Sequence, residues 1–370
     1  MKTFEPELDR LKAIGRYRSL NLPSGIDFSS NDYLGLSKHP ALRQTAIEAL
    51  QGGIEVGASA SRLLRGHRQA HEDLERFAAI YFARPRTLFF ANGYQANFAL
   101  ITALVKREDV VVYDALCHAS MRDGLHMTRC RAIKARHNDL NAFEDALKEG
   151  RAAGGNVWLL VESVYSMDGD VAPLRELLLL VEKHDALMIV DEAHGTGVSG
   201  LTGRGETEGL DSERLIVLHT CGKALGVAGA LVCASEPVIS YLVNAARPFI
   251  YSTAPMPLQA VLVKRALEIV RDEPQRREQL LALRTLAAKR MPKIAINSQI
   301  VPIVVGEDRA AVALATALQA SGFDIRAIRP PTVPEGTARL RLSLHVGLSR
   351  GDLTAFTDTL SRLLPERLCV

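Results

Sequence analysis

Hydrophobic positions form short, continuous runs that alternate with helical patterns between about residues 86 and 234. A strand that is apolar throughout, rather than at every second position, is typical of a parallel sheet buried on both faces. The pattern therefore predicts an α/β fold with a mainly parallel sheet between helices. The expected strands are Thr87–Phe90, Val110–Tyr113, Ala132–Lys134, Val157–Val161, Leu187–Val190, Leu215–Leu218 and Ala228–Cys233, and the expected helices are 94–105, 118–126, 141–149 and 173–184.

The pattern changes on both sides of this region. Before it, a short helix is expected within about 7–20, ending near Gly15, and further helices are expected at 40–51 and 69–82. After it come a long helical pattern at 257–290, helices at 308–320 and 350–363, and strands at Ile300–Val305, Ile325–Ile328 and Ala338–Leu344. The later elements are typical of a smaller α+β domain. We therefore expect an N-terminal segment (1–38), a large domain (39–256) and a small C-terminal domain (257–370).

Composition narrows the class of protein. The 370 residues are 47% hydrophobic, and 45 Lys and Arg balance 42 Asp and Glu, which argues against a general nucleic-acid surface. The five cysteines are scattered without a C-x-x-C pair, so neither a disulfide framework nor a metal site is expected. The N-terminal residues are acidic and no apolar run reaches bilayer length, so we expect a cytoplasmic protein that does not enter membranes.

Lys223 is the first candidate for covalent chemistry. It lies between the apolar runs Leu215–Leu218 and Ala228–Cys233, among small and hydroxyl-bearing residues. An amine in a partly desolvated pocket titrates lower than in water and can form an imine with an aldehyde. Taken alone, the same pattern also fits a lysine at a strand end that extends into solvent.

Other polar residues follow the predicted strands, at the edge where parallel α/β sheets bind ligands. Gly93 and Tyr94 open a helix, whose free N–H groups favour a phosphate, although an ordinary strand-to-helix turn looks the same. Asp191 ends a buried strand, where a carboxylate needs a cation such as a protonated ring nitrogen; metal binding with His194 is the competing interpretation. His118 starts another helix and either stacks on a planar cofactor or caps the helix.

These groups together describe a site for pyridoxal 5′-phosphate, whose ring accepts electrons while its nitrogen stays protonated. The chain resembles the α-oxoamine synthases, which share the aspartate-aminotransferase fold of pyridoxal-phosphate enzymes. The resemblance covers nearly the whole chain. It depends on the motifs Asn31–Leu36, Ser166–Asp170, Asp191–Gly197, Thr220–Gly226, Ile250–Thr253 and Ile328–Arg341. The last motif is most similar to the members that join L-alanine to a pimeloyl thioester in biotin synthesis.

The resemblance implies a role for each matching residue. For the cofactor, it makes Lys223 the Schiff-base lysine and Asp191 the partner of the ring nitrogen. It assigns the other cofactor contacts to His118 (ring face), His194 and Ser166 (ring oxygen), Gly93, Tyr94 and Thr220 (phosphate), and Ser252 and Thr253 (phosphate of the neighbouring subunit). For the substrates, it assigns Arg341 to the amino-acid carboxylate, Asn31 and Glu162 to the reacting centre, and Arg18 and Thr332 to the thioester, with Arg16 as an alternative to Arg18.

The implied reaction needs a homodimer with shared active sites, L-alanine, and pimeloyl-CoA or a pimeloyl carrier protein. Lys223 is expected to remove the α-proton as a general base, and His118 to donate a hydrogen bond to the thioester oxygen or the carboxylate. A condensation that uses glycine or serine, such as glycine C-acetyltransfer, is the nearest alternative. A non-catalytic cofactor-binding module is a distant one, because residues 1–40 are too short and not basic enough for a DNA-binding segment.

Overall fold

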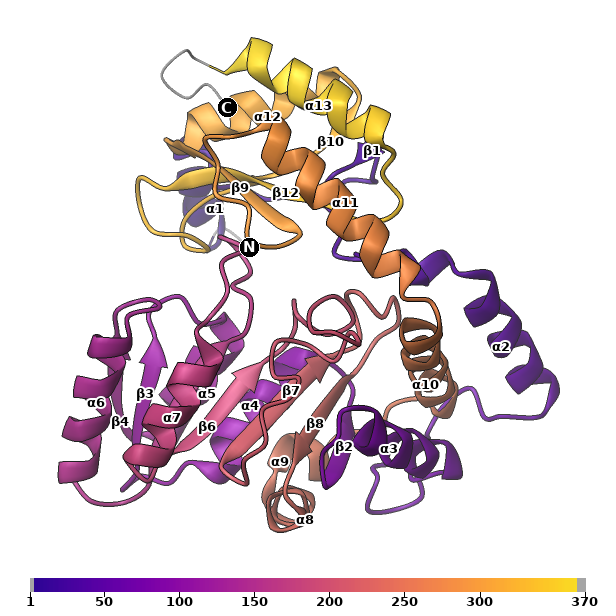
Figure 1. Ribbon diagram of the computed structural model, residues 1–370, viewed down its shortest axis with the longest axis vertical. Helices are drawn as coiled ribbons and strands as arrows, with labels where there is room; N and C mark the ends of the chain where they lie inside the picture. Colours follow the sequence, from indigo (N-terminus) through magenta and orange to yellow (C-terminus); the bar gives the residue numbers. More distant parts are fainter. Residues whose placement is uncertain (1–2, 365–370) are drawn as a thin grey trace. The chain divides into compact units, whose positions relative to one another are not determined.

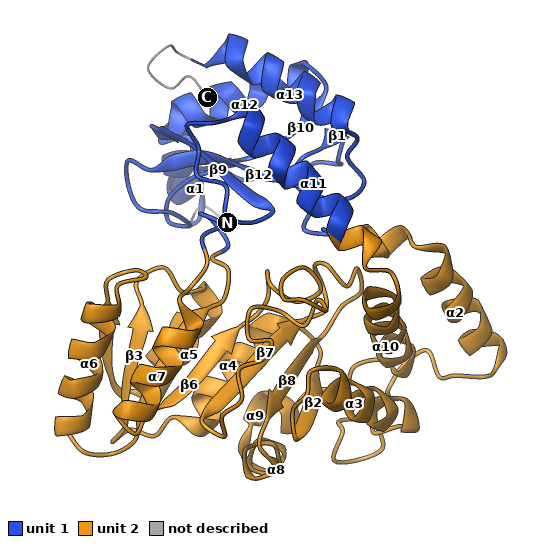
Figure 2. Cartoon of the chain, viewed as in Figure 1, with its two compact units in different colours: residues 1–33, 166–170, 278–370 blue, residues 34–165, 171–277 orange. Residues whose placement is uncertain are grey.

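The computed structural model describes residues 3–364, which form two compact units (Figure 2). Of the described residues, unit 1 comprises 3–33, 166–170 and 278–364. Unit 2 comprises residues 34–165 and 171–277. Each unit is therefore assembled from segments that are distant in the sequence.

Unit 2 contains a seven-stranded sheet with the order β2-β8-β7-β6-β5-β3-β4 (Figure 1). The five strands from β4 to β7 in this order are parallel, and β8 is antiparallel to both β7 and β2. The expected α/β fold with a mainly parallel sheet is confirmed. The strands are β2 (Arg86–Phe90), β3 (Val110–Asp114), β4 (Arg131–Ala135), β5 (Val157–Glu162), β6 (Leu187–Asp191), β7 (Leu215–Thr220) and β8 (Ala230–Ala234).

Helices cover both faces of this sheet. On one face, apolar residues of α4, α5, α8 and α9 form one buried cluster with alternate residues of the strands, including Ile189 and Leu218. On the other face, Gly150 of α6 lies against Val110 and Val157. The helices of unit 2 are the 3-10 helix η1 (Leu36–Lys38), α2 (Pro40–Gln51), α3 (Gln69–Tyr81), α4 (Gly93–Leu104), α5 (Ala119–Thr128), α6 (Leu140–Ala152), α7 (Leu174–Lys183), α8 (Glu236–Ala245), α9 (Arg247–Ile250) and α10 (Pro257–Asp272).

Unit 1 is built on a three-stranded antiparallel sheet with the order β11-β12-β9, and β1 pairs with β10 in a separate parallel ladder. Helix α11 (Gln275–Arg290) begins in unit 2 and continues into unit 1. The other elements of unit 1 are α1 (Glu5–Ala13), β1 (Ile26–Asp27), β9 (Ile300–Gly306), α12 (Asp308–Ala320), β10 (Phe323–Asp324), β11 (Ala327–Ile328), β12 (Ala338–Ser343) and α13 (Arg350–Leu363).

The structure differs from the sequence-based prediction at the unit boundaries. The helical pattern at 257–290 is two helices, α10 and α11, with Pro274 between them, because proline cannot donate the backbone hydrogen bond of a helix interior. Helix α10 belongs to unit 2 rather than to a domain starting at 257, because it packs against α2 and α3. The N-terminal helix starts at Glu5, earlier than expected, and ends at Ala13, close to the end expected near Gly15, whose φ of 70° is left-handed. Among residues 3–364, no helix combines the length and the apolarity needed to cross a bilayer.

Candidate active site

A pocket of about 250 Å³ in unit 2 collects polar residues from the segments that follow the strands. Of the residues expected from the sequence, the structure brings seven together here, and they come from α4, β5, β6, β7 and the loops beside them. Its lining residues are Asn92, Gly93, Tyr94, Asn97, His118, Ser120, Glu162, Asp191, Ala193, Thr220, Gly222, Lys223, Ala228 and Gly229. The pocket therefore lies at the carboxyl ends of the strands, the edge at which parallel α/β sheets bind ligands.

Lys223 lies in the connection between the antiparallel strands β7 and β8. Backbone hydrogen bonds brace this connection: Cys221 N–H donates to the Gly229 carbonyl at 2.9 Å, and Gly226 N–H donates to the Lys223 carbonyl at 2.8 Å. The Lys223 amine is 2.7 Å from Nε2 of His194, which is 3% exposed. Lys223 thus lines the pocket with its amine beside a buried imidazole, and does not extend freely into solvent.

Asp191 ends strand β6 and is 4% exposed. Its side chain shares the sheet face of Ile189, because side chains alternate along a strand, and α4 covers that face. Oδ2 accepts a hydrogen bond from Nδ2 of Asn97 at 2.7 Å, and Oδ1 accepts one from the Ala193 N–H at 2.8 Å. Two donors stabilise the buried carboxylate, which keeps further lone pairs for a cationic ligand in the pocket.

The N-terminus of α4 has the properties of an anion site. Asn92 caps the helix by accepting a hydrogen bond from the Gln95 N–H at 2.8 Å. Among the described residues, the N–H groups of Gly93 and Tyr94 have no hydrogen-bond acceptor. A Cβ at Gly93 would lie 2.5 Å from Cγ2 of Thr220, so only glycine allows these two residues to lie so close. The arrangement fits a phosphate group held by free N–H groups and a hydroxyl.

His118 is the N-cap residue of α5 and also lines the pocket. Its Nδ1 is 2.8 Å from Oγ of Ser120 and accepts a longer hydrogen bond, of 3.3 Å, from the Ser120 N–H. Burial lowers the pKa of His118, and the Lys223 and Arg122 charges act in the same direction, whereas Asp191 opposes them. His118 therefore caps the helix, one of the two expected alternatives, and also lines the pocket, so that stacking on a planar cofactor stays a prediction.

Three further expected residues come together within unit 1. Arg341, on β12, donates from Nη1 to Oδ1 of Asn31 at 3.0 Å and to Oγ of Ser343 at 2.9 Å. Its Nη2 donates to the Tyr33 hydroxyl at 3.2 Å, and its Nε donates to the Ser166 carbonyl. These bonds hold the guanidinium, 8% exposed as a residue, in one orientation. Arg341, Asn31 and Ser166 therefore form one cluster in unit 1.

The residues expected to contact the thioester are also in unit 1. Arg16 makes ion pairs with Asp308 at 2.8 Å and with Glu335 at 2.7 Å. Arg18 is exposed and has no ion pair among the described residues. Arg16 therefore has a structural role that occupies its guanidinium, which leaves Arg18 as the better candidate of the two.

The expected inter-subunit residues do not line the pocket of their own chain. Oγ of Ser252 accepts a hydrogen bond from Nε2 of Gln95, at 3.0 Å, and Thr253 is exposed. Nearby, the Ala254 N–H donates to the Ala60 carbonyl at 3.0 Å. This segment therefore lies beside the start of α4 and beside the loop around Ala60.

Sequence reasoning missed Asn97 and Ser120, which are buried and line the pocket. Asn97 lies one turn after Gly93 in the otherwise mostly apolar helix α4. A buried amide in such a helix needs a polar partner, so an asparagine at this position could have identified Asn97 as a candidate from the sequence. Ser120 carries no comparable signal, because serine is common in the first turn of a helix.

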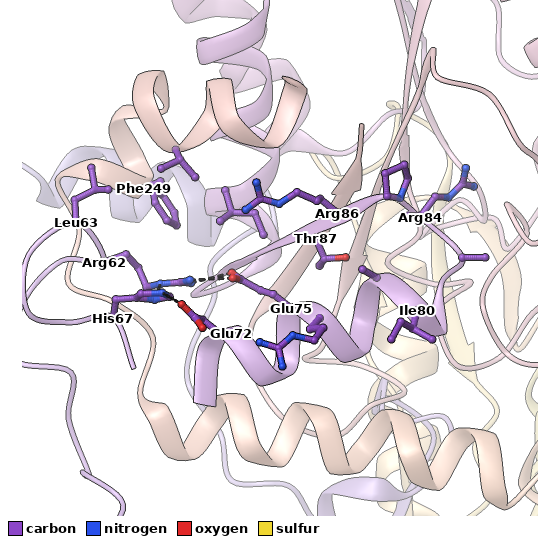
Figure 3. Close-up of a pocket in the computed structure, with 16 residues that line it drawn as sticks. Arg62, Leu63, His67, Glu72, Glu75, Ile80, Arg84, Arg86, Thr87 and Phe249 are labelled. Carbon is purple, nitrogen blue, oxygen red and sulfur yellow. Dashed lines mark hydrogen bonds and ion pairs between the residues drawn. The ribbon is translucent and has the colours of Figure 1, made fainter. Parts of the chain in front are cut away.

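A second and larger pocket in unit 2, of about 700 Å³, lies elsewhere (Figure 3). Two pairs form between residues of its lining: Arg62 with Glu75 at 2.9 Å, and His67 with Glu72 at 3.1 Å. Its lining contains no lysine and no asparagine or aspartate. Despite its size, it lacks the groups that a pyridoxal-phosphate site requires.

Residues 23–360 match the protein family described as aminotransferase class I and II. The chain belongs to this family. An 8-amino-7-oxononanoate synthase of Chromobacterium violaceum is 42% identical to it and covers 96% of each chain. The fold class and the resemblance to the α-oxoamine synthases are therefore confirmed.

Solved structures of the aminotransferase class I and II fold agree with this assignment. Serine palmitoyltransferase of Sphingomonas wittichii has a TM-score of 0.87 at 28% identity, over 92% of this chain and 87% of that chain. An 8-amino-7-oxononanoate synthase from Francisella tularensis has a TM-score of 0.79 at 26% identity, over 92% of this chain and 97% of that chain. The two structures are named for different activities, so the fold alone does not select the reaction.

Proposed function

We propose that the protein is a pyridoxal-phosphate-dependent 8-amino-7-oxononanoate synthase, which condenses L-alanine with a pimeloyl thioester and releases carbon dioxide and the thiol. The name shared by its relatives supports the reaction. The observation that carries the cofactor assignment is the pocket that holds Lys223, Asp191 and the start of α4 together. In the overall reaction, a C–C bond forms between the alanine α-carbon and the thioester carbonyl carbon, and the C–S bond breaks. The bond to the alanine carboxylate then breaks.

The pocket fits pyridoxal phosphate by its chemistry. Lys223 would hold the cofactor covalently, Asp191 would accept a hydrogen bond from its protonated ring nitrogen, and the N–H groups of Gly93 and Tyr94 would hold its phosphate together with Thr220. The bound cofactor withdraws electrons from the substrate α-carbon. Asp191 maintains that effect, because its negative charge favours the protonated ring nitrogen.

The side chains of this chain then bind substrates and move protons. Lys223 removes the α-proton as a general base, and His194, 2.7 Å from its amine, orients that amine. His118 would stack on the face of the cofactor ring and would donate a hydrogen bond to a substrate oxygen. Arg341 binds the alanine carboxylate with the Nη2 N–H that its hydrogen bonds to Asn31, Ser343, Tyr33 and Ser166 do not use. The other proposed substrate contacts are Asn31, Glu162, Arg18 and Thr332, and Ser166 is proposed to act on the ring oxygen.

The substrate assignment is tested by measuring carbon dioxide and thiol release from alanine, glycine and serine against pimeloyl, acetyl and succinyl thioesters. We expect the pair of alanine and a pimeloyl thioester to have the highest kcat/KM. Both coenzyme A and carrier-protein thioesters are included, because the proposal covers either carrier. A preference for serine or glycine, or for a short acyl chain, would overturn the proposed substrates while leaving the cofactor assignment intact.

The cofactor assignment is tested separately with Lys223→Ala. We expect the purified protein to be yellow, and the variant to lose the absorbance of the covalently held cofactor together with turnover. Lys148→Ala, at an exposed position of α6, is the matched control and should keep both. An unchanged visible band in Lys223→Ala would refute the role of this lysine, and a wild-type protein that binds the cofactor but turns over none of the substrate pairs would favour a non-catalytic module.

We further propose a homodimer in which Ser252 and Thr253 reach the phosphate of the neighbouring subunit. The support is a group of exposed apolar side chains beside that segment, namely Leu63 (50% exposed), Leu64 (76%) and Tyr251 (72%). Apolar groups that gather at a surface are typical of interfaces between subunits. Equilibrium sedimentation should give a dimer, and mixed dimers of Lys223→Ala with an inactive Thr253 variant should regain activity if sites are shared. A monomer with full activity would contradict the proposal.

We also propose that the protein works in a reducing cytoplasm. Cys117, Cys130, Cys221 and Cys233 are free thiols, and Cys369 lies outside the described residues. Burial raises the pKa of the Cys221 and Cys233 thiols, which keeps them protonated and unreactive. Thiol titration of the unfolded protein should recover all five cysteines as thiols.

A further inference from the structure

A continuous hydrogen-bond chain connects Asp191 to His118 through two residues of neighbouring helices. Asn97, on α4, donates from Nδ2 to Oδ2 of Asp191 at 2.7 Å and to Oγ of Ser120 at 3.0 Å. Ser120, on α5, is 2.8 Å from Nδ1 of His118 through the same Oγ. Asn97 and Ser120 are 1% and 0% exposed, so water does not compete for these bonds.

The donors and acceptors along this series of hydrogen bonds can be assigned in only one way. A carboxylate accepts hydrogen bonds and does not donate them, so Asn97 must turn its NH₂ group, not its carbonyl, toward Asp191. The second N–H of that group then donates to Ser120 Oγ, whose own proton remains for His118 Nδ1. The Ser120 backbone N–H also donates to Nδ1. Nδ1 therefore accepts hydrogen bonds, and the ring proton of a neutral imidazole belongs on Nε2.

The amide oxygen of Asn97 agrees with this direction. Asn97 Oδ1 is buried and has no hydrogen-bond donor among the described residues, so the nitrogen alone orients the amide. Turning the amide over would place the carbonyl against the carboxylate of Asp191 and lose the hydrogen bond to that carboxylate. Leaving a buried carboxylate without its donor costs more than leaving one neutral carbonyl oxygen.

We infer that Asn97 and Ser120 are positioning residues that hold His118 in the tautomer with its proton on Nε2. No hydrogen bond is present at His118 Nε2 among the described residues, and the ring lines the pocket. A hydrogen-bond donor is thereby presented to the ligand. This inference deepens the proposed function: the acid that stabilises the charged cofactor ring also determines, through two neutral side chains, which nitrogen of the stacking histidine donates to the substrate oxygen.

The charged groups near His118 do not determine its tautomer. Asp191 and Asp123 favour the protonated ring, whereas Lys223 and Arg122 disfavour it, and burial outweighs each of them in lowering its pKa. The ring is therefore neutral near pH 7, which is the state in which the two nitrogens differ. The direct contacts at Nδ1, all from Ser120, then decide between the two tautomers.

The test is nitrogen NMR of the full-length protein labelled with ¹⁵N-histidine and freed of cofactor, with His118→Gln used to assign the His118 signals. We expect wild-type His118 to show a protonated Nε2 and an unprotonated Nδ1. Ser120→Ala and Asn97→Leu should shift the signals toward a mixture of tautomers. Thr102→Ala on α4 and Thr128→Ala on α5 are matched controls and should match the wild type. The Thr102 hydroxyl bonds only the backbone of its own helix, and the Thr128 hydroxyl bonds the backbone of its helix and Sγ of Cys130.

A second measurement covers the possibility that Asn97→Leu is unstable. In Ser120→Ala, which removes one oxygen atom, we expect kcat with alanine and the pimeloyl thioester to fall about tenfold with little change in the affinity for pyridoxal phosphate. In Asn97→Leu the cofactor affinity should also fall, by about tenfold, because Asp191 loses a hydrogen bond. Wild-type tautomer signals in both variants would overturn the inference. If the tautomer shifts but the wild-type protein does not use alanine, the proposed substrate is wrong and the positioning role stands.

Discussion

Glu192 is a buried acid whose ionisation should destabilise the fold, and the effect can be isolated by Glu192→Gln. The residue is 0% exposed, and burial raises the pKa of its carboxyl group to about 7, from an ordinary value of 4.5. Oε2 accepts from Oγ of Ser163 and Oε1 accepts from the Thr207 N–H, both at 2.6 Å. A glutamine amide has the same shape and can keep an acceptor toward Thr207 while its NH₂ group faces the serine oxygen.

The magnitude follows from the change in pKa. A rise from 4.5 to about 7 corresponds to about 3 kcal/mol in the free energy of unfolding, at about 1.4 kcal/mol per unit. Because the folded pKa is raised, this contribution is fully present below pH 4.5 and is lost as the pH rises through about 7. Between about pH 5.5 and pH 8.5, ionisation of Glu192 should lower the free energy of unfolding of the wild type by about 2 kcal/mol. In Glu192→Gln no group ionises at this position, so this contribution does not change with pH.

The assay is urea unfolding of wild type and Glu192→Gln at both pH values, with Glu213→Gln, at an exposed position, as the control. The comparison uses the difference between the proteins, since many other groups titrate equally in both. We expect Glu192→Gln to gain about 2 kcal/mol relative to wild type between the lower and the higher pH. A difference that stays constant within about 0.5 kcal/mol would show that Glu192 does not ionise in this range, and would refute the reasoning.

Three other substitutions test separate features of the site and the fold. Gly93→Ala should weaken cofactor binding, because its Cβ would lie 2.5 Å from Cγ2 of Thr220, and adding Thr220→Ser, which removes that methyl group, should restore the affinity measured by absorbance titration. Asp191→Asn should keep the fold by circular dichroism but reduce kcat by about a hundredfold or more, and near-normal turnover would remove its proposed role. Gly226→Ala should lower the free energy of unfolding by about 2 kcal/mol or more, since its φ is 64° and the Cβ would lie 2.2 Å from the Ser37 nitrogen; an unchanged urea midpoint would contradict this.

The sheet of unit 2 was predictable because its strands are apolar on both faces. Such a continuous apolar pattern can be recognised without knowing which elements pack against the strand. The ends of the strands then place Asp191, Thr220 and Lys223 at one pocket. The expected role of Lys223 as a pocket residue depended on the two apolar runs that enclose it. The structure shows these runs as antiparallel strands joined by a short, hydrogen-bonded connection.

The composition of the units was not predictable in the same way. Residues 166–170 leave unit 2 and return to it, between Val164 and Val171, which pair in an isolated bridge. The hydrophobic pattern does not change at residues 166–170, because the segment is short and lies in the connection that follows a strand. In unit 1, Ser166 accepts a hydrogen bond from Arg341, a residue far away in the sequence. Such contacts depend on tertiary structure, which local patterns do not encode.

Asp191 and Glu192 are adjacent acids whose environments can be told apart by the alternation of side chains along a strand. Both follow a buried strand, and their order alone does not say which one meets the cofactor. Strand alternation does, because Asp191 shares a face with Ile189 and that face is covered by α4, where Asn97 donates to it. Glu192 instead bonds Ser163, outside the pocket lining, and is raised in pKa by burial. Alternation along the strand therefore places the Asp191 carboxylate in the pocket lining, where we propose that it binds the cofactor, and places the Glu192 carboxylate outside that lining.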